Sequence, residues 1–92
     1  MNGKTIKEFL ETLSWGEEME FIYKGEHFFI QGVNNGEDNK EIQLFSCDKQ
    51  GPMLYTLKCK SFSSGIVQFQ KDKILDGKTI YELDDLITVV YG

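Results

Sequence analysis

Two copies of Gly-Lys-Thr-Ile occur in the chain, at residues 3–6 and 77–80. Gly-Lys-Thr also ends the phosphate-binding loop of many nucleotide-binding proteins, which follows a strand and has a further glycine five residues earlier. The second copy has Asp72 where that glycine is required, and no strand or loop precedes the first copy. The repeat therefore favours a role in starting helices over a role in binding nucleotides.

Nucleophilic catalysis is the next chemistry to consider, because a histidine can activate a cysteine or a serine. His27 is the single histidine, and its formal partners are Cys47, Cys59 and the serines at positions 61, 63 and 64. Their spacing does not bring any of them together, and no CxxC or HxxxH spacing indicates a metal site. We expect His27 on the outer face of a hairpin, and we predict no catalytic, cofactor-binding or metal-binding residue. A small hydrolase using His27 with a cysteine or a carboxylate is the less favoured alternative.

Acidic residues form two clusters, one around the start of the first predicted strand and one on the last predicted helix. Aromatic residues, among them Trp15, lie near the first cluster. Solvation explains the acids and packing explains the aromatics, but aromatic side chains rimmed by carboxylates also suit a protein interface. The candidate partner-binding residues are Glu17, Glu18, Glu20, Tyr23, Phe29, Glu82, Asp84 and Asp85.

The charge balance narrows the class of partner. The chain has 92 residues, fifteen acids and ten basic residues, all of them lysine, for a net charge of −5. Without arginine it lacks the planar donor fork best suited to phosphate and guanine, and its negative charge opposes binding to a polyanion. We therefore expect no direct nucleic-acid ligand, and a basic protein as the natural partner.

The sequence also indicates a compartment. No apolar run approaches the roughly 18 residues that span a bilayer, and the first residues lack the apolar region of a signal peptide. We expect no membrane association and a cytoplasmic location.

The two cysteines fit the same location. A hairpin around Cys47 and Cys59 would place them on the order of 20 Å apart at ~3.3 Å per residue, too far for a disulfide. Two free, buried thiols fit a reducing compartment.

The first helix is predicted from an apolar stripe at helical spacing, Ile6, Phe9, Leu10 and Leu13, with Lys7, Glu8, Glu11 and Thr12 pointing outward. Thr5 and Glu8 form a capping-box signature, and Gly16 is placed to end the helix in the left-handed region.

Residues 17–31 alternate as a hairpin of two strands. A turn at residues 24–25 would place Phe21 opposite Phe28 and Met19 opposite Ile30, whereas a turn at 25–26 shifts the pairing by two residues and keeps the same faces together.

The polar loop 34–40 leads to a second predicted hairpin. Its strands are 41–47 and 53–59, with Met53, Tyr55, Leu57 and Cys59 on one face. Pro52 is tolerable only at the start of a strand or on an edge.

The last third of the chain is predicted to be mainly helical before a final strand. Residues 61–73 fit either a strand or a helix, and we favour a short helix. Thr79 and Glu82 repeat the capping box, followed by an inner stripe of Ile80, Leu83 and either Leu86 or Ile87, and ITVVY forms the last strand.

These elements predict a single α+β domain over residues 1–92, with an N-terminal helix, a mainly antiparallel sheet of about five strands, one or two short C-terminal helices and a final strand. Both capped helices should pack on the same sheet through Ile6 and Ile80. The predicted core is Ile6, Phe9, Leu10, Leu13, Met19, Phe21, Phe28, Ile30, Tyr55, Leu57, Ile80, Leu83 and Val89.

The stretch GEEMEFIYKGEHFFI, followed by a long hairpin and ILDGKTIYEL, resembles a group of small bacterial proteins. Their pattern is glutamate–apolar–glutamate–Phe–x–Tyr–x–Gly–Lys–x–Tyr/Phe–x–Ile, and this chain departs from it with Glu26 in place of the lysine. The resemblance implies no catalytic activity. In size and charge the chain is also similar to immunity proteins, which bind and block toxic nucleases. We therefore expect a non-catalytic module that binds a basic protein, with a structural homodimer joined at sheet edges as the alternative.

Overall fold

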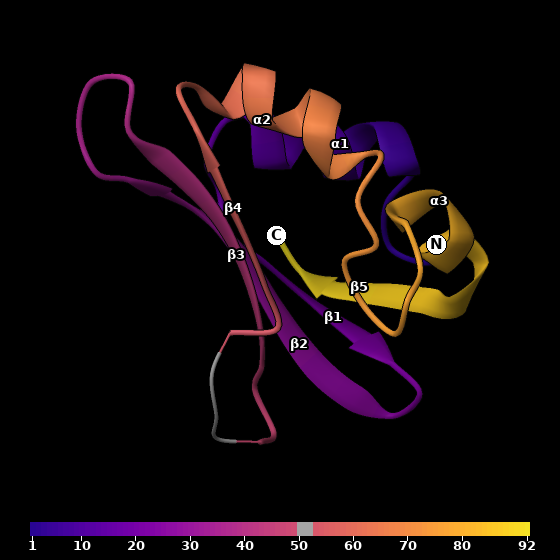
Figure 1. The fold of residues 1–92 in the computed structure, drawn as a ribbon. Coiled ribbons are helices and arrows are strands. Elements are labelled where there is room, and N and C mark those ends of the chain that lie inside the picture. The colour runs from indigo at the N-terminus through magenta and orange to yellow at the C-terminus, as the bar shows by residue number, and fades with distance from the viewer. Residues whose placement is uncertain (50–52) are drawn as a thin grey trace.

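One layer of the protein is an antiparallel sheet, and the helices pack on one face of it (Figure 1). The computed structural model describes residues 1–49 and 53–92. Its elements, in chain order, are α1 (Ile6–Ser14), β1 (Met19–Tyr23), β2 (Glu26–Asn34), β3 (Lys40–Ser46), β4 (Tyr55–Cys59), α2 (Phe62–Phe69), α3 (Ile80–Leu83), the 3-10 turn η1 (Asp84–Leu86) and β5 (Ile87–Tyr91). The predicted α+β class is confirmed. No helix among the described residues is long and apolar enough to cross a membrane.

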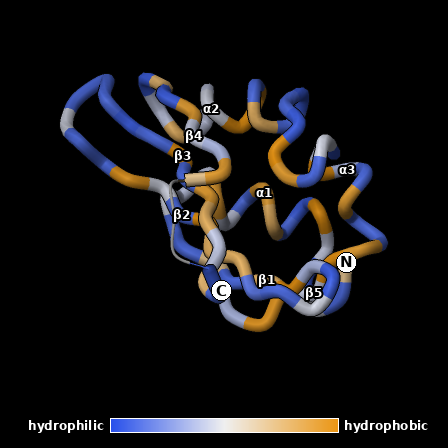
Figure 2. Tube along the Cα trace, turned by 60° about the horizontal axis from the view of Figure 1, so that its bottom comes forward, coloured by the Kyte–Doolittle hydropathy of each residue, from blue (hydrophilic) through white to orange (hydrophobic). Residues whose placement is uncertain are grey.

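The five strands lie in the order β4-β3-β2-β1-β5. Strands β1 to β4 form a meander in which each strand pairs with the next, and β5 then crosses to pair with β1. The loop between β2 and β3 is a hydrophilic segment that extends away from the body of the molecule (Figures 1 and 2).

Helix α1 begins and ends as the sequence predicts. The Thr5 hydroxyl accepts the amide of Glu8, and the Glu8 carboxylate accepts the amide of Thr5. At the other end Gly16 has φ +76°, and the amides of Gly16 and Glu17 donate to the carbonyls of Leu13 and Thr12, which is a Schellman motif.

The expected outward position of Thr12 is wrong. Thr12 is buried, and its hydroxyl donates to the carbonyl of Glu8 at 2.9 Å. The side chain can therefore be buried without leaving an unsatisfied polar group.

The first hairpin has the register predicted for a turn at residues 24–25. Phe21 pairs with Phe28 and Met19 pairs with Ile30. Lys24 and Gly25 have φ +50° and +77°, the backbone signs of a type I′ turn, whose twist matches that of antiparallel strands.

The second hairpin is also present, with a shorter second strand than predicted. β3 pairs with β4 from Lys40 opposite Cys59 to Leu44 opposite Tyr55. Met53 lies before the strand and is exposed, so its predicted place on the apolar face is wrong. Pro52 and part of the connecting turn lie outside the described residues.

The helical interpretation of residues 61–73 is confirmed by α2, which is capped by a reciprocal Ser61–Ser64 pair. The second Gly-Lys-Thr-Ile starts a helix as the first does, because Thr79 and Glu82 complete the same box. α3 is a single turn. Of the two alternatives for the inner stripe, Ile87 is buried as the first residue of β5, while Leu86 is exposed.

One apolar core lies between the sheet and the helices. Of the thirteen predicted members, nine are buried, and Ile6, Leu10, Tyr55 and Leu57 pack half-buried against them. Ile80 and Ile6 thus contact the same core, as expected. Among the described residues, the prediction omitted six buried apolar side chains: Tyr23, Ile42, Leu44, Phe69, Ile74 and Ile87.

Candidate functional site

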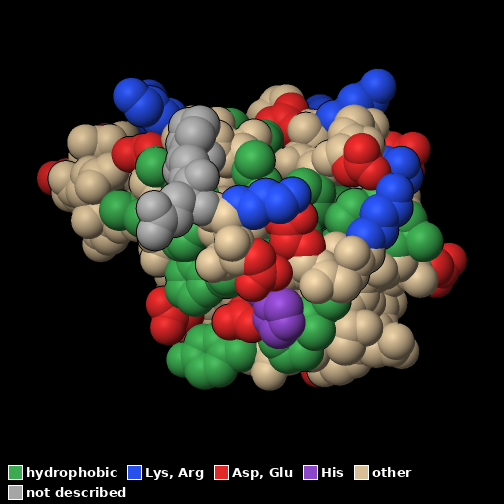
Figure 3. All heavy atoms as spheres, turned by 90° about the horizontal axis from the view of Figure 1, so that it is seen from below, with side chains coloured by type: hydrophobic (Ala, Val, Ile, Leu, Met, Phe, Trp, Pro, Cys, Tyr) green, Lys and Arg blue, Asp and Glu red, His purple; other side chains and the backbone are tan. Residues whose placement is uncertain are grey.

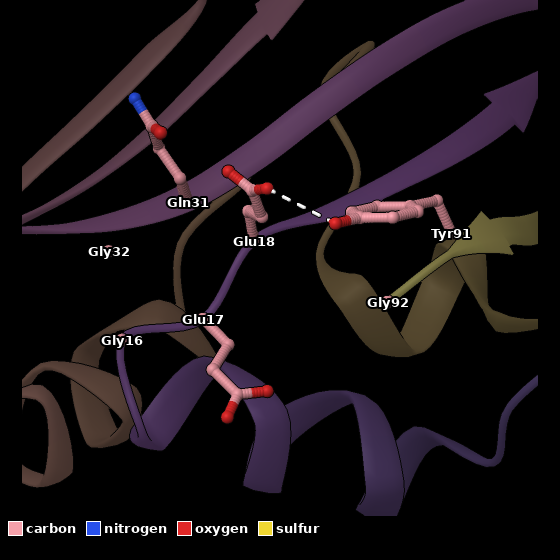
Figure 4. A pocket seen from close by; sticks show the side chains of 7 residues that line it. All are labelled: Gly16, Glu17, Glu18, Gln31, Gly32, Tyr91 and Gly92. Atoms are coloured by element: carbon pink, nitrogen blue, oxygen red, sulfur yellow. Dashed lines mark hydrogen bonds between the residues drawn. The ribbon is translucent and has the colours of Figure 1, made fainter.

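A pocket of about 380 Å³ lies between the turn after α1 and the start of β1 on one side, and β2 and the end of β5 on the other (Figure 4). Its lining comes from three separate parts of the chain: Gly16, Glu17, Glu18, Gln31, Gly32, Tyr91 and Gly92. Both charged side chains in this lining are carboxylates.

The inner end of the pocket depends on a close approach of two backbones. A Cβ atom at Gly32 would lie 2.6 Å from the Cα of Gly16 and 2.7 Å from the Phe62 ring. A Cβ at Gly16 would lie 2.5 Å from the same ring. The two glycines therefore let the turn after α1 rest directly on β2.

The two glutamates of the pocket project in opposite directions from the chain before β1 (Figure 4). The Tyr91 hydroxyl donates to Oε1 of Glu18 at 3.3 Å, which links β5 to the start of β1. Both glutamates are exposed. Within residues 1–49 and 53–92, none of the ion pairs involves Glu17 or Glu18.

The third acid of this cluster, Glu20, lies on the sheet face opposite the helices and contacts His27. Nδ1 of His27 lies 2.6 Å from Oε2 of Glu20, and the backbone amide of His27 donates to Asp48 at 2.7 Å. Figure 3 shows the histidine, in purple, among acidic side chains. The hydrogen bond to Glu20 raises the pKa of His27.

Cys47 follows the end of β3 and lies beside His27 of β2, since the amide of Cys47 donates to the carbonyl of His27 at 2.8 Å. The expectation that both thiols are buried is wrong for Cys47, which is exposed, whereas Cys59 is half-buried; both are free. Partial desolvation and the nearby charges of Glu20 and Asp48 raise the pKa of the Cys47 thiol. A raised pKa disfavours the thiolate that a nucleophile requires.

The second acidic cluster is largely occupied within the fold. Glu82 caps α3, and Asp84 accepts the amino group of Met1 at 2.6 Å. Asp85 is exposed. This cluster therefore offers fewer free carboxylates than the one at Glu17 and Glu18.

The aromatic residues near the first acidic cluster differ in how much of each side chain is exposed. Tyr23 is 5% exposed, its ring packs beside Phe28, and its hydroxyl donates to Asp76, so it has no surface to offer a partner. Its assignment as a partner-binding residue is therefore corrected to a core residue. Phe29 is half-buried on the face opposite the helices, and Trp15 is 67% exposed.

Comparisons with protein-family models, curated proteins and solved structures find no match. In the part of the chain that the structure describes, no group of three or more histidine, cysteine or acidic side chains is arranged to hold a metal ion. Sequence reasoning identified two residues of the pocket, Glu17 and Glu18. It missed Gln31, Tyr91 and the glycines because their proximity arises only from the packing of the turn after α1 on β2 and from the pairing of β5 with β1.

The contact between His27 and Glu20 predicts a pH-dependent contribution to stability. A histidine whose pKa is raised in the folded state contributes stability that is complete below its unfolded pKa, about 6.5, and is lost as the pH rises through the folded pKa. Wild type should thus exceed His27→Gln in stability by more near pH 5.5 than near pH 8.5, values about one to two units either side of the ordinary pKa. Urea unfolding followed by circular dichroism measures both. A gap between the two proteins that does not change with pH would contradict the expectation.

Proposed function

We propose that this protein is a non-catalytic module that binds a basic protein partner through the acidic surface at Glu17, Glu18 and Glu20. An inhibitor of the immunity type, which neutralises a basic toxin or nuclease by binding it, is the specific form that we favour. The observation that carries the proposal is the pocket whose two carboxylates have no cationic partner within the described residues.

Other acidic side chains support this by contrast. Asp76 contacts the amines of Lys24 and Lys78, and Glu26 contacts Lys49 at 3.0 Å. The chain has lysines available to neutralise carboxylates, yet in the described structure it leaves the pair in the pocket uncompensated. A lysine or arginine from a partner would supply the missing charge.

Such an interface would act mainly through the rate of association. Complementary charges steer the encounter of two proteins, and salt screens them over about 10 Å at 0.1 M ionic strength. The net charge of −5 adds a long-range attraction to a basic partner. Binding should therefore be faster at low salt than at high salt.

A charge-reversal experiment tests the proposal. Tagged wild-type protein captures partners from a lysate of its source, and the affinity of the purified partner is then measured by calorimetry. We expect Glu17→Lys with Glu18→Lys to weaken binding at least about tenfold, equivalent to about 1.4 kcal/mol, and to flatten its salt dependence. The matched control is Glu11→Lys with Glu37→Lys, which changes the net charge equally at exposed positions away from the pocket. Equal affinities for wild type and both double variants would refute the acidic interface.

A thiol hydrolase is the second candidate because the Glu20 carboxylate contacts Nδ1 of His27, and the backbone of Cys47 lies beside that of His27. The raised pKa of the thiol argues against it. Ester hydrolysis by the wild type that disappears in Cys47→Ser would be needed to prefer it.

A further inference from the structure

The sheet face opposite the helices carries large apolar side chains on three adjacent strands. Ile22 on β1, Phe29 on β2 and Phe45 on β3 all alternate with buried residues and so project away from the core. All three are half-buried, although the helices lie on the other side of the sheet (Figure 1). We call these three residues, together with Glu20 and His27 between them, the outer patch.

The outer patch is continuous across the strands. Phe29 pairs directly with Phe45, and their ring centroids lie 5.2 Å apart. Ile22 pairs with His27, and Glu20 pairs with Phe29, which places Ile22 and Phe29 on one diagonal and the titratable pair on the other. Diagonal neighbours on a sheet lie about 7–8 Å apart, within reach of aromatic side chains.

Stability of the sheet alone accounts for only part of this arrangement. A cross-strand aromatic pair contributes only a small part of the stability of a sheet. A solvated face of an antiparallel sheet usually carries polar residues instead, as this one does next to the patch, where Gln31 donates to Gln43. Aromatic side chains surrounded by polar ones are the composition of an interface centre.

The pocket alone is too small to form a stable interface. Standard protein interfaces bury about 800 Å² and roughly 20–30 residues from each partner, whereas seven residues line the pocket. Gln31 connects the two regions, because it lines the pocket and lies two residues from Phe29 on the same face of β2. Glu20 also belongs to both the proposed acidic surface and the outer patch, so the two regions adjoin.

The charges of the outer patch indicate what would cover it. Within the patch the Glu20 carboxylate contacts His27, and Asp48 accepts the backbone amide of His27 at its border. Among the described residues, the nearby carboxylates of Asp48, Glu17 and Glu18 take part in no ion pair. None of the five residues is a lysine. An apolar side chain flanked by lysine or arginine therefore complements the outer patch better than a second copy of this acidic chain does.

We propose that the outer patch is the apolar anchor of the interface, and that it takes an apolar or aromatic residue of the basic partner flanked by lysine or arginine. This inference rests on the proposed function, because it describes the part of the basic partner that would contact the outer patch. Phe45 is thereby added to the interface, and the partner is specified beyond its net charge.

A defined peptide tests the inference without the natural partner. The probe is an acetylated, amidated Lys-Phe-Lys-Phe tetrapeptide, and Glu-Phe-Glu-Phe is its matched control. Titration into ¹⁵N-labelled protein should shift the amide signals of Phe29, Phe45 and Gln31 with a dissociation constant on the order of 1 mM, and the control should bind at least about fivefold more weakly. Phe45→Thr, which keeps a strand-forming residue, should abolish these shifts, and Glu20→Gln should weaken them.

Several outcomes of this titration, and one measurement with a captured partner, would overturn the inference. The first is an absence of shifts with the lysine peptide, and the second is equal binding of both peptides or shifts located elsewhere. The third is movement of the Phe29 and Phe45 signals with protein concentration alone, which would assign the patch to a second copy of the chain. A captured partner that binds Phe45→Thr normally would also contradict it while leaving the proposed function intact. Loss of binding in Glu17→Lys with Glu18→Lys concerns the proposed function instead.

Discussion

Replacing Phe9 with alanine is expected to lower the free energy of unfolding by about 3–5 kcal/mol. The Phe9 side chain is fully buried, and its ring packs against Phe21 of β1 and Phe69 of α2, with centroids 6.3 Å and 6.5 Å away. One ring thus joins α1 to both the sheet and the second helix. Since small domains are stable by about 5–15 kcal/mol in total, this single change would leave much of the population unfolded under mild denaturing conditions.

Urea unfolding followed by far-ultraviolet circular dichroism measures this loss. Phe9→Leu is the matched control, because it keeps most of the apolar volume and should cost clearly less than the alanine variant. A loss below about 1 kcal/mol for Phe9→Ala would show that the three elements do not depend on this ring for their packing.

Gly32→Ala is expected to destabilise the protein by about 1–3 kcal/mol, although it adds one methyl group. The added Cβ would meet the Cα of Gly16 at 2.6 Å and the Phe62 ring at 2.7 Å. A backbone atom cannot rotate out of the way, so the turn after α1 must move off β2. The pocket at Glu17 and Glu18 should change shape with it, which amide chemical shifts of those residues would detect.

Gly65→Ala is the comparison that isolates the cause. At that position the nearest atom to an added Cβ is Sγ of Cys59, at 2.7 Å. The thiol is the end of a side chain and can rotate, and alanine gains about 1 kcal/mol over glycine inside a helix such as α2. Gly65→Ala should therefore lower the free energy of unfolding by less than Gly32→Ala does. Equal losses in the two variants would contradict the role of the contact between the two backbones.

Local sequence signals predicted much of the fold because the interactions behind them are local. The capping boxes at Thr5 and Thr79 join residues three apart, so their geometry is contained in the sequence. The register of the first hairpin was also predictable from the sequence, because only pairings that keep Phe21 and Phe28 on one face bury an apolar surface.

The remainder depends on contacts between distant segments. Tyr23 follows the inward alternation of β1, but the acceptor of its hydroxyl, Asp76, comes from the loop before α3. The pocket forms because Gly16 and Gly32 touch and Tyr91 returns beside Glu18. The proximity of Cys47 to His27 follows from the register of β2 with β3. Periodicity in one stretch of sequence carries no information about such meetings.

The position of β5 has a consequence for how the chain reaches this structure. Strands β1 to β4 can pair in succession through short connections. The pairing of β1 with β5 instead joins Phe21 to Val89, which lies near the other end of the chain. Closing such a large loop costs entropy before its contacts are gained, and folding slows as contacts become less local. The meander should therefore form early in folding. Docking of β5, to which Asn2 also bonds, should complete the native state last.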